Sequence, residues 1–233
     1  MNGDIIFFSI IAALTTILGG SLPLIKKKIN SDFFAALAAG ILLSVAFIDM
    51  IPNGMILGGS LGIATGFILM YIMEQITMIH VCSEGRCDRH VIGPLGICGI
   101  TFHSLIDGAA IALGFSISYE LGYLVLLSVL IHEFPEGLVT TSLMLGTKYS
   151  KKIAFLSSFI VAIATPIGAI VTLIFLPSVP QYIIGVGIMF TAGTFIYVGT
   201  SDILPRIHKK SDWSIILTFL IGFLAIIGLH LFI

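Results

Sequence analysis

Residues 91–115 read VIGPLGICGITFHSLIDGAAIALGF, an apolar run that contains one histidine and one aspartate, His103 and Asp107. About 20 consecutive apolar residues are enough for an α-helix to cross a bilayer. A second run, at residues 121–146, carries His132 and Glu136 at the same spacing. Residues four apart lie on one face of a helix, one turn from each other. If the two helices face each other, their two imidazoles and two carboxylates converge on one point.

The rest of the chain has the same character. Of its 233 residues, 58% are hydrophobic and only 10% are charged, and the mean hydropathy is +1.14. Soluble domains carry about 25% charged residues, so a soluble enzyme is excluded. The apolar runs are continuous rather than alternating, which indicates helices and not a β-barrel. We predict an all-α polytopic membrane protein, a single transmembrane domain over 1–233 with eight transmembrane helices, at about 5–25, 33–52, 55–79, 91–115, 121–146, 153–176, 181–204 and 213–233.

The basic residues predict the orientation. All 11 Lys and Arg fall in four loops, after the first, third, fifth and seventh spans: Lys26, Lys27, Lys28, Arg86, Arg89, Lys148, Lys151, Lys152, Arg206, Lys209 and Lys210. By the positive-inside rule these loops are cytoplasmic, and both termini lie outside. We expect a multi-pass protein of the cell membrane whose first span is retained, because its positive cluster follows the apolar run. The external loops are expected to be short, the first of them at Asn53–Gly54.

Two pairs of segments indicate an inverted repeat. Residues 39–52, AGILLSVAFIDMIP, match residues 192–205, AGTFIYVGTSDILP, in Ala, Gly, Val, Asp and Pro. The predicted spans that contain them run in opposite directions, as do the fourth and fifth spans with their matching histidine–acid pairs. Inverted repeats with a site near the midplane are typical of transporters. The alternative is a chance match between apolar stretches. We predict a 3+2+3 repeat.

Acidic residues inside the spans suggest the chemistry. Carboxylates in the bilayer are costly, by roughly 2.5–3.5 kcal/mol each on insertion scales. No Lys or Arg lies clearly within a span, so the acids are either protonated or paired with a cation. Imidazole beside carboxylate suits Zn, Fe, Mn or Co rather than an alkali ion. His103, Asp107, His132 and Glu136 are therefore candidate metal ligands, and a proton-sharing structural cluster is the alternative.

Other residues are weaker candidates. Ser104 and Glu133 each follow a histidine and lie about 100° around the helix from it. Glu133 could bind a second ion or carry protons, or it could be a hydrogen-bonded acid at a helix contact; Ser104 is a weak ligand. Three further acids, at the outer end of the second span and the inner ends of the third and seventh, could line a transport path or simply reach water: Asp49, Glu74 and Asp202.

The loop between the third and fourth predicted spans, HVCSEGRCDRH at residues 80–90, concentrates histidine and cysteine. It could act as a cytoplasmic acceptor for released metal through His80, Cys82, Cys87 and His90. Cys-x₄-Cys is not by itself a strong zinc spacing, so an ordinary solvated connector is the alternative.

The motifs HSLIDG, residues 103–108, and HEFPEG, residues 132–137, resemble the paired signatures of the ZIP (Zrt/Irt-like) metal transporters. The resemblance extends over the eight spans and the external termini. It implies a transporter that moves divalent metal toward the cytoplasm, with His103, Asp107, His132 and Glu136 as its primary site. Some members have a second site that uses Asn and Glu where this chain has Ser104 and Thr165, so only Glu133 remains for a second ion.

We therefore expect a divalent transition-metal transporter, with zinc as the first expectation and iron, manganese, cobalt and cadmium as alternatives. No organic cofactor and no nucleic-acid partner are expected; the partners are membrane lipid and the metal ion, and a homodimer is left open. The competing hypothesis is an intramembrane metal-dependent hydrolase, in which His132-Glu133 begins a His-Glu-x-x-His motif and Glu133 is the general base. Position 136 is Glu rather than His, which departs from that motif.

Overall fold

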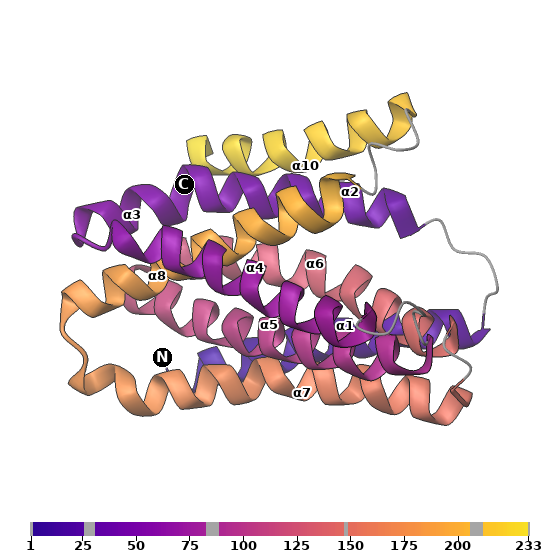
Figure 1. The fold of residues 1–233 in the computed structure, drawn as a ribbon. Helices are drawn as coiled ribbons and strands as arrows, with labels where there is room; N and C mark the ends of the chain where they lie inside the picture. Colours follow the sequence, from indigo (N-terminus) through magenta and orange to yellow (C-terminus); the bar gives the residue numbers. More distant parts are fainter. Residues whose placement is uncertain (1, 26–30, 83–88, 147–148, 206–211, 233) are drawn as a thin grey trace.

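The computed structural model describes residues 2–25, 31–82, 89–146, 149–205 and 212–232, and within them it is helical without strands. The helices run alongside one another through the molecule (Figure 1). Their bounds are α1 Asn2–Ile25, α2 Ser31–Ser44, α3 Ile51–Ile56, α4 Leu61–Cys82, α5 Arg89–Ile117, α6 Tyr119–Gly146, α7 Lys151–Phe175, α8 Gln181–Tyr197 and α10 Trp213–Phe232. Two π-helical segments, η1 Val45–Met50 and η3 Val198–Ile203, and the 3₁₀ turn η2 Leu176–Ser178 complete the order.

Six of the helical stretches are long and apolar enough to cross a membrane: Asn2–Ile25, Ala36–Ile56, Ile97–Ile117, Tyr119–Leu145, Lys151–Ser178 and Gln181–Ser201. Two shorter apolar stretches, Leu61–Ile76 and Trp213–Gly228, lie within the third and eighth predicted spans. The expectation of an all-helical, multi-pass membrane protein is confirmed, whereas the exact number of spans stays a prediction.

The helices form two groups. In the first group α1 packs on α6 and α7, and α5 packs on the same two helices. In the second group α2 packs on α10, and α4 packs on α8. Figure 1 shows α2 and α10 side by side at one edge of the molecule, with α7 at the opposite edge. Contacts of α6 with α2 and of α5 with α8 join the two groups.

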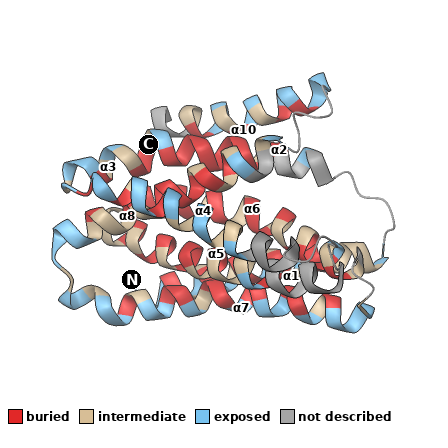
Figure 2. Ribbon diagram, viewed as in Figure 1, coloured by how far each residue is buried: buried red, intermediate tan, exposed pale blue. Residues whose placement is uncertain are grey.

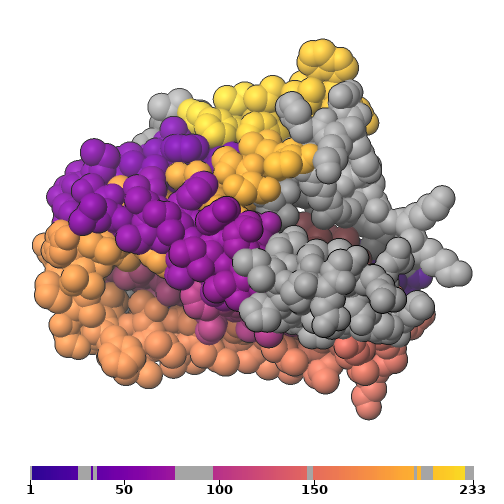
Figure 3. All heavy atoms as spheres, viewed as in Figure 1, coloured from indigo at the N-terminus to yellow at the C-terminus, as the bar shows by residue number. Residues whose placement is uncertain are grey.

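The outward faces are apolar, as lipid requires. Along α7 the exposed side chains include Leu156, Ile160, Ile163 and Ile167. Buried residues lie toward the interior of the bundle, and exposed ones mark the outer side of α7 (Figure 2). In the space-filling view of the same face, α7 forms one continuous edge of the molecule (Figure 3).

Close backbone contacts hold the first group together. A Cβ added at Gly137 of α6 would lie 1.9 Å from the carbonyl oxygen of Thr16 in α1, and one added at Gly108 of α5 would lie 1.8 Å from the carbonyl oxygen of Thr165 in α7. Any side chain larger than hydrogen would force the helices apart at these crossings. In membranes, where lipid is as apolar as the side chains, such small residues let helices gain contact by close approach.

The first turn after the second predicted span lies later than expected. Helix α3 continues through Asn53 and Gly54 to Ile56, and the chain reverses over residues 57–60. Gly58 has φ +82°, its N–H donates to the Met55 carbonyl, and the N–H of Gly59 donates to the Gly54 carbonyl, which is the Schellman ending of a helix. The Asn-Gly pair predicts a turn, but Gly54 is helical, and Met189 of α8 packs where a side chain at this position would lie.

The two π-helical segments each end shortly before a proline, Pro52 or Pro205. Proline has no N–H to donate to the preceding turn. One extra residue in that turn shifts the bonding, so the N–H of Ile51 donates to the Ala46 carbonyl and that of Leu204 to the Gly199 carbonyl. Insertions of this kind are frequent at functional sites.

Helix ends outside the bundle are capped locally. The Oγ of Ser118 accepts the N–H of Leu121 at 3.0 Å and starts α6. The Oδ1 of Asp212 accepts the N–H of Ser214 at 2.9 Å and starts α10. This hydrogen bond holds the pKa of the Asp212 carboxyl below its ordinary value, because it stabilises the ionised form.

Candidate metal site

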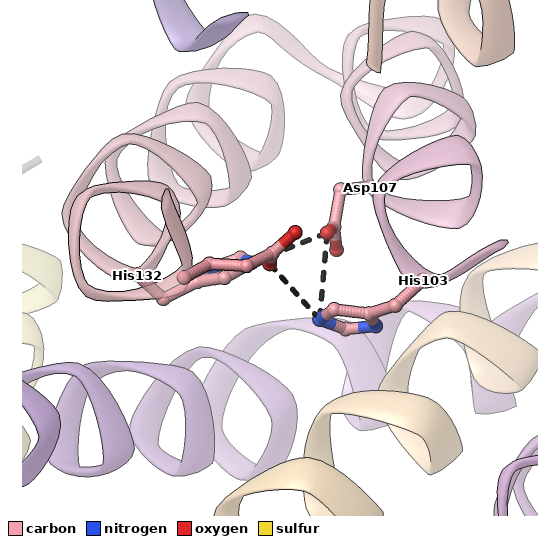
Figure 4. Close-up of side chains that lie close together, drawn as sticks. His103, Asp107 and His132 are labelled. Carbon is pink, nitrogen blue, oxygen red and sulfur yellow. Dashed lines mark hydrogen bonds and ion pairs between the residues drawn. The ribbon is translucent and has the colours of Figure 1, made fainter. Parts of the chain in front are cut away.

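Four side chains from α5 and α6 meet inside the first helix group. His103, Asp107, His132 and Glu136 each offer one ligand atom, and these atoms all lie within 4.8 Å of one another. His103 and Asp107 come from α5, and His132 and Glu136 come from α6. Figure 4 shows His103, Asp107 and His132 pointing toward a common point. Because Ser118 alone separates the two helices, they run antiparallel and bring the two pairs to the same level.

The distances suit a small divalent ion. The Nε2 of His132 lies 3.2 Å from the Oδ2 of Asp107, and the Nε2 of His103 lies 3.4 Å from the same oxygen. The Nε2 of His103 is 4.0 Å from the Oε2 of Glu136. A tetrahedral ion with bonds of about 2.0–2.1 Å holds its ligand atoms about 3.3 Å apart. The dashed lines in Figure 4 mark hydrogen bonds and ion pairs between the residues drawn.

Burial and unused hydrogen-bonding capacity also fit a metal ion. Asp107 is fully buried, and His103 and His132 are 5% and 4% exposed. Among the described residues, neither ring nitrogen of His103, nor Oδ1 of Asp107, nor Oε2 of Glu136 has a hydrogen-bond partner. Buried polar atoms without partners are rare and call for a bound group. A cation at this point would coordinate lone pairs that the protein leaves open.

The orientation of His132 is fixed by its own helix. Its Nδ1 lies 2.8 Å from the carbonyl oxygen of Ser128. A carbonyl only accepts, so Nδ1 carries a proton, and Nε2, which lies 3.2 Å from the Oδ2 of Asp107, is the ring atom that would bind an ion. Hydrogen bonds of this kind orient metal-binding histidines and raise their basicity. From the second helix group, the ring of Phe195 meets the His132 ring edge to face, with centroids 5.6 Å apart.

Ser104 and Glu133 lie beside the four clustered side chains rather than among them. The hydroxyl of Ser104 donates to the Oε1 of Glu136 at 2.5 Å. Glu133 is fully buried, and its Oε1 accepts a hydrogen bond from the hydroxyl of Thr165 in α7. Its other oxygen, Oε2, has no hydrogen-bond partner among the described residues. A role for either residue with a second ion stays a prediction.

Of the acids expected along the path, Asp49 and Glu74 are not part of this cluster. Asp49 is 2% exposed and lies in η1. The side-chain amide of Asn53 donates to the main-chain carbonyl oxygen of Asp49 at 2.8 Å. Glu74 of α4 accepts a hydrogen bond from the hydroxyl of Tyr197 in α8. The side chain of Asp202 lies outside the described residues, as do Cys87 and the side chains of His80, Cys82 and His90. The proposed path and the acceptor loop therefore stay predictions.

The sequence model of the ZIP zinc transporter family matches residues 83–230, which include α5, α6 and all four clustered side chains. The chain belongs to the ZIP family of zinc transporters. It is 24% identical to the zinc transporter ZupT of Chlorobium luteolum, over 97% of this chain and 96% of that protein. It is 29% identical to the zinc transporter zipt-7.1 of Caenorhabditis briggsae, over 55% of this chain but only 33% of the longer worm protein. Zinc transporter ZIP9 of Micropogonias undulatus is 28% identical, over 61% of this chain and 49% of its own length.

Two contributions to this ZIP site were missed from the sequence. The carbonyl of Ser128 could have been found, because a histidine ring in a helix can reach the main chain one turn earlier. Phe195 could not, because it is 63 positions from His132 and reaches it only through the packing of α8 against the first helix group.

Proposed function

We propose that this chain is a metal transporter that carries a divalent transition-metal ion through the membrane, with the ion bound on its way by His103, Asp107, His132 and Glu136. One observation carries the proposal: two imidazoles and two carboxylates, three of them buried and Glu136 half-buried, converge between two long apolar helices. The ion is the substrate, and the chemistry is ligand exchange. No bond in the protein needs to be made or broken.

Zinc is our first choice of substrate, with iron, manganese, cobalt and cadmium as alternatives. Mixed imidazole and carboxylate donors suit these ions. The absence of a thiolate from the four-residue cluster argues against Cu(I). The ZupT relative, which is matched over nearly its whole length, is described as a zinc transporter.

We further propose that residues 1–233 form one domain of eight spans in a 3+2+3 inverted repeat. The π-helical segments support it, because Val45–Met50 and Val198–Ile203 occupy the same positions in the matched segments 39–52 and 192–205. A second support comes from Gly40 and Gly193, which occupy the same position in these two matched segments. A Cβ at Gly40 would lie 2.2 Å from the Phe219 carbonyl oxygen, and one at Gly193 would lie 2.1 Å from that of Ile63.

The first helix group repeats this relationship. The contact of Gly137 with Thr16 corresponds to that of Gly108 with Thr165. In the same way, a Cβ at Gly19 would lie 1.9 Å from the Phe134 carbonyl oxygen, and one at Gly168 would lie 2.0 Å from that of Leu105. Phe134 and Leu105 each stand two residues after a ligand histidine. A two-fold axis in the membrane plane would relate all of these pairs.

Transport into the cytoplasm is the proposed direction. The 11 basic residues fall in loops on one side of the proposed topology, which places that side in the cytoplasm and both termini outside the cell membrane. Asp49 would then lie near the entrance, and Glu74, Asp202 and the loop at residues 80–90 near the exit.

A hydrolase at the same centre has less support. Glu133 would have to activate a water at the metal, but its carboxylate is hydrogen-bonded to Thr165 on α7. The relatives named above are described as zinc transporters.

The test is uptake of radioactive zinc into vesicles that contain the purified protein. We expect zinc-dependent, saturable uptake that is lost in His103→Ala combined with His132→Ala. Thr191→Ala is the control, because this buried hydroxyl bonds only within its own helix, to the Gly187 carbonyl. Equal uptake by the double variant and the control would refute the proposed site. Unlabelled Fe²⁺, Mn²⁺, Co²⁺ and Cd²⁺, added as competitors, rank the ions.

A further inference from the structure

Three hydroxyl groups on α6, those of Ser128, Thr140 and Thr141, do not bond as helix hydroxyls commonly do. Serine and threonine in a helix can donate to a carbonyl three or four residues earlier, as Thr191 does to Gly187 and Thr218 to Ser214. Ser128 and Thr140 are fully buried, and neither hydroxyl oxygen has a hydrogen-bond partner among the described residues. Thr141 shares this property, so the positions of Ser128 and Thr140 relative to the metal ligands, rather than the open oxygens alone, indicate a use.

The hydroxyls of Ser128 and Thr140 lie on the face of α6 that carries the metal ligands. Ser128, His132, Glu136 and Thr140 follow one another at intervals of four residues, so they form a row along one side of the helix. Ser128 is one turn before the site, and Thr140 is one turn after it. The row therefore places an oxygen on each side of the four-ligand cluster.

The facing helix has no such row. Contacts of Asp107 with His132 and of His103 with Glu136 fix the register of α5 against α6. One turn further in each direction, this register places Ile111 level with Ser128 and Gly99 level with Thr140. Ile111 is fully buried and apolar, and a Cβ built at Gly99 would meet no described atom within 4 Å. At these levels, only α6 of the two helices offers side-chain oxygens.

We propose that the ion enters and leaves its four-ligand site along this face of α6, with the hydroxyls of Ser128 and Thr140 as the next oxygen contacts on either side. The inference rests on the proposed transport function. A neutral hydroxyl binds a divalent ion, or one of its waters, more weakly than a carboxylate does. Such a contact replaces part of the hydration shell without trapping the ion, which is what a conducting path requires.

Thr141 provides a matched control. It is the same residue type as Thr140, it is also fully buried, and its hydroxyl also lacks a hydrogen-bond partner among the described residues. It lies about 100° further around the helix. A Cβ added at Gly20 of α1 would be 3.0 Å from its Oγ1, so Thr141 faces α1 rather than α5.

The first experiment uses cysteine accessibility. In the variant Cys82→Ser, Cys87→Ser, Cys98→Ser, one cysteine is added by Ser128→Cys, Thr140→Cys or Thr141→Cys. Vesicles are treated with a small cationic methanethiosulfonate, with and without zinc, and zinc uptake is then measured. We expect treatment to reduce uptake at least about fivefold at positions 128 and 140, with protection by zinc, and to leave the position 141 variant unchanged. Modification at 141 that equals that at 140 would overturn the path.

The second experiment keeps the shape of the side chain. Thr140→Val should slow zinc uptake by about fivefold, whereas the number of tightly bound zinc ions stays the same, and Thr141→Val should transport at the normal rate. Normal uptake by Thr140→Val, or an equal loss in Thr141→Val, would overturn the path alone. Absence of uptake by the unmodified protein would overturn the transport function and the path together.

Discussion

The Nδ1–H of His132 donates to the main-chain carbonyl of Ser128, one turn earlier on α6, at 2.8 Å. The bond leaves Nε2 as the ring atom that faces Asp107 of the neighbouring helix, 3.2 Å from its Oδ2. Because a main-chain atom makes it, no side-chain change at position 128 removes it. The orientation of the His132 ring is thus a property of the helix, and the four clustered side chains are the positions to test.

The number of bound ions separates one metal site from two. We expect one tightly bound transition-metal ion per chain, measured by calorimetry and elemental analysis. His103→Ala should weaken binding by more than about 100-fold, since loss of an outer partner alone costs about 10–100-fold. Ser104→Ala should keep the ion, because its hydroxyl serves Glu136 rather than the metal. Two equally tight ions in the unmodified protein would contradict this interpretation of Ser104 and Thr165.

Glu133→Gln should have an intermediate effect. The amide keeps the shape of the side chain and can still accept the hydrogen bond from Thr165, but it has no charge. We expect slower zinc uptake with little change in the affinity of the four-ligand site. Titration of bound zinc, run beside the uptake assay, checks both parts. A loss of affinity as large as that of His103→Ala would show that Glu133 is a direct ligand.

Binding should weaken in acid. Metal binding requires deprotonated ligands, so protons compete with the ion for His103 and His132. Lowering the pH from about 7 to about 5 should therefore reduce zinc affinity. Equilibrium zinc binding, measured at each pH and at fixed ionic strength, gives this change in affinity. Affinity that stays constant across this range would argue against histidine ligation.

The glycine contacts predict a stability difference. Gly137→Ala places a methyl group 1.9 Å from the Thr16 carbonyl oxygen, so α1 and α6 must separate. Overpacking of this kind typically costs about 1–3 kcal/mol. Thermal unfolding in detergent should show a lower midpoint. Gly228→Ala in α10 is the control, because its Cβ meets no described atom within 4 Å. Equal midpoints for the two variants would contradict the close contact.

The orientation can be tested from outside the cell. In the variant without native cysteines, Gly3→Cys and Ser118→Cys should react with an impermeant thiol reagent, and Lys151→Cys should not. Labelling at position 151 in sealed cells would reverse the topology and the inferred direction of transport.

The sequence by itself determined the membrane class, the all-helical fold and the two histidine–acid pairs. These follow from continuous apolar runs and from a spacing of four residues, and both are local properties of a helix. The same local reasoning placed the first external loop at Asn53–Gly54, which was wrong, because Gly54 lies within α3, packed against Met189 of α8.

Only the tertiary structure decided how the four ligands meet, and which neighbours surround them. The antiparallel register of α5 and α6 sets the 3.2 Å approach of Asp107 to His132. Contacts across helices direct Glu133 to Thr165 and bring Phe195 against the His132 ring. The partners in these contacts are 25 to 63 positions apart in the chain. Helical periodicity says which residues share a face, but the close packing of helix backbones at glycine decides which faces meet.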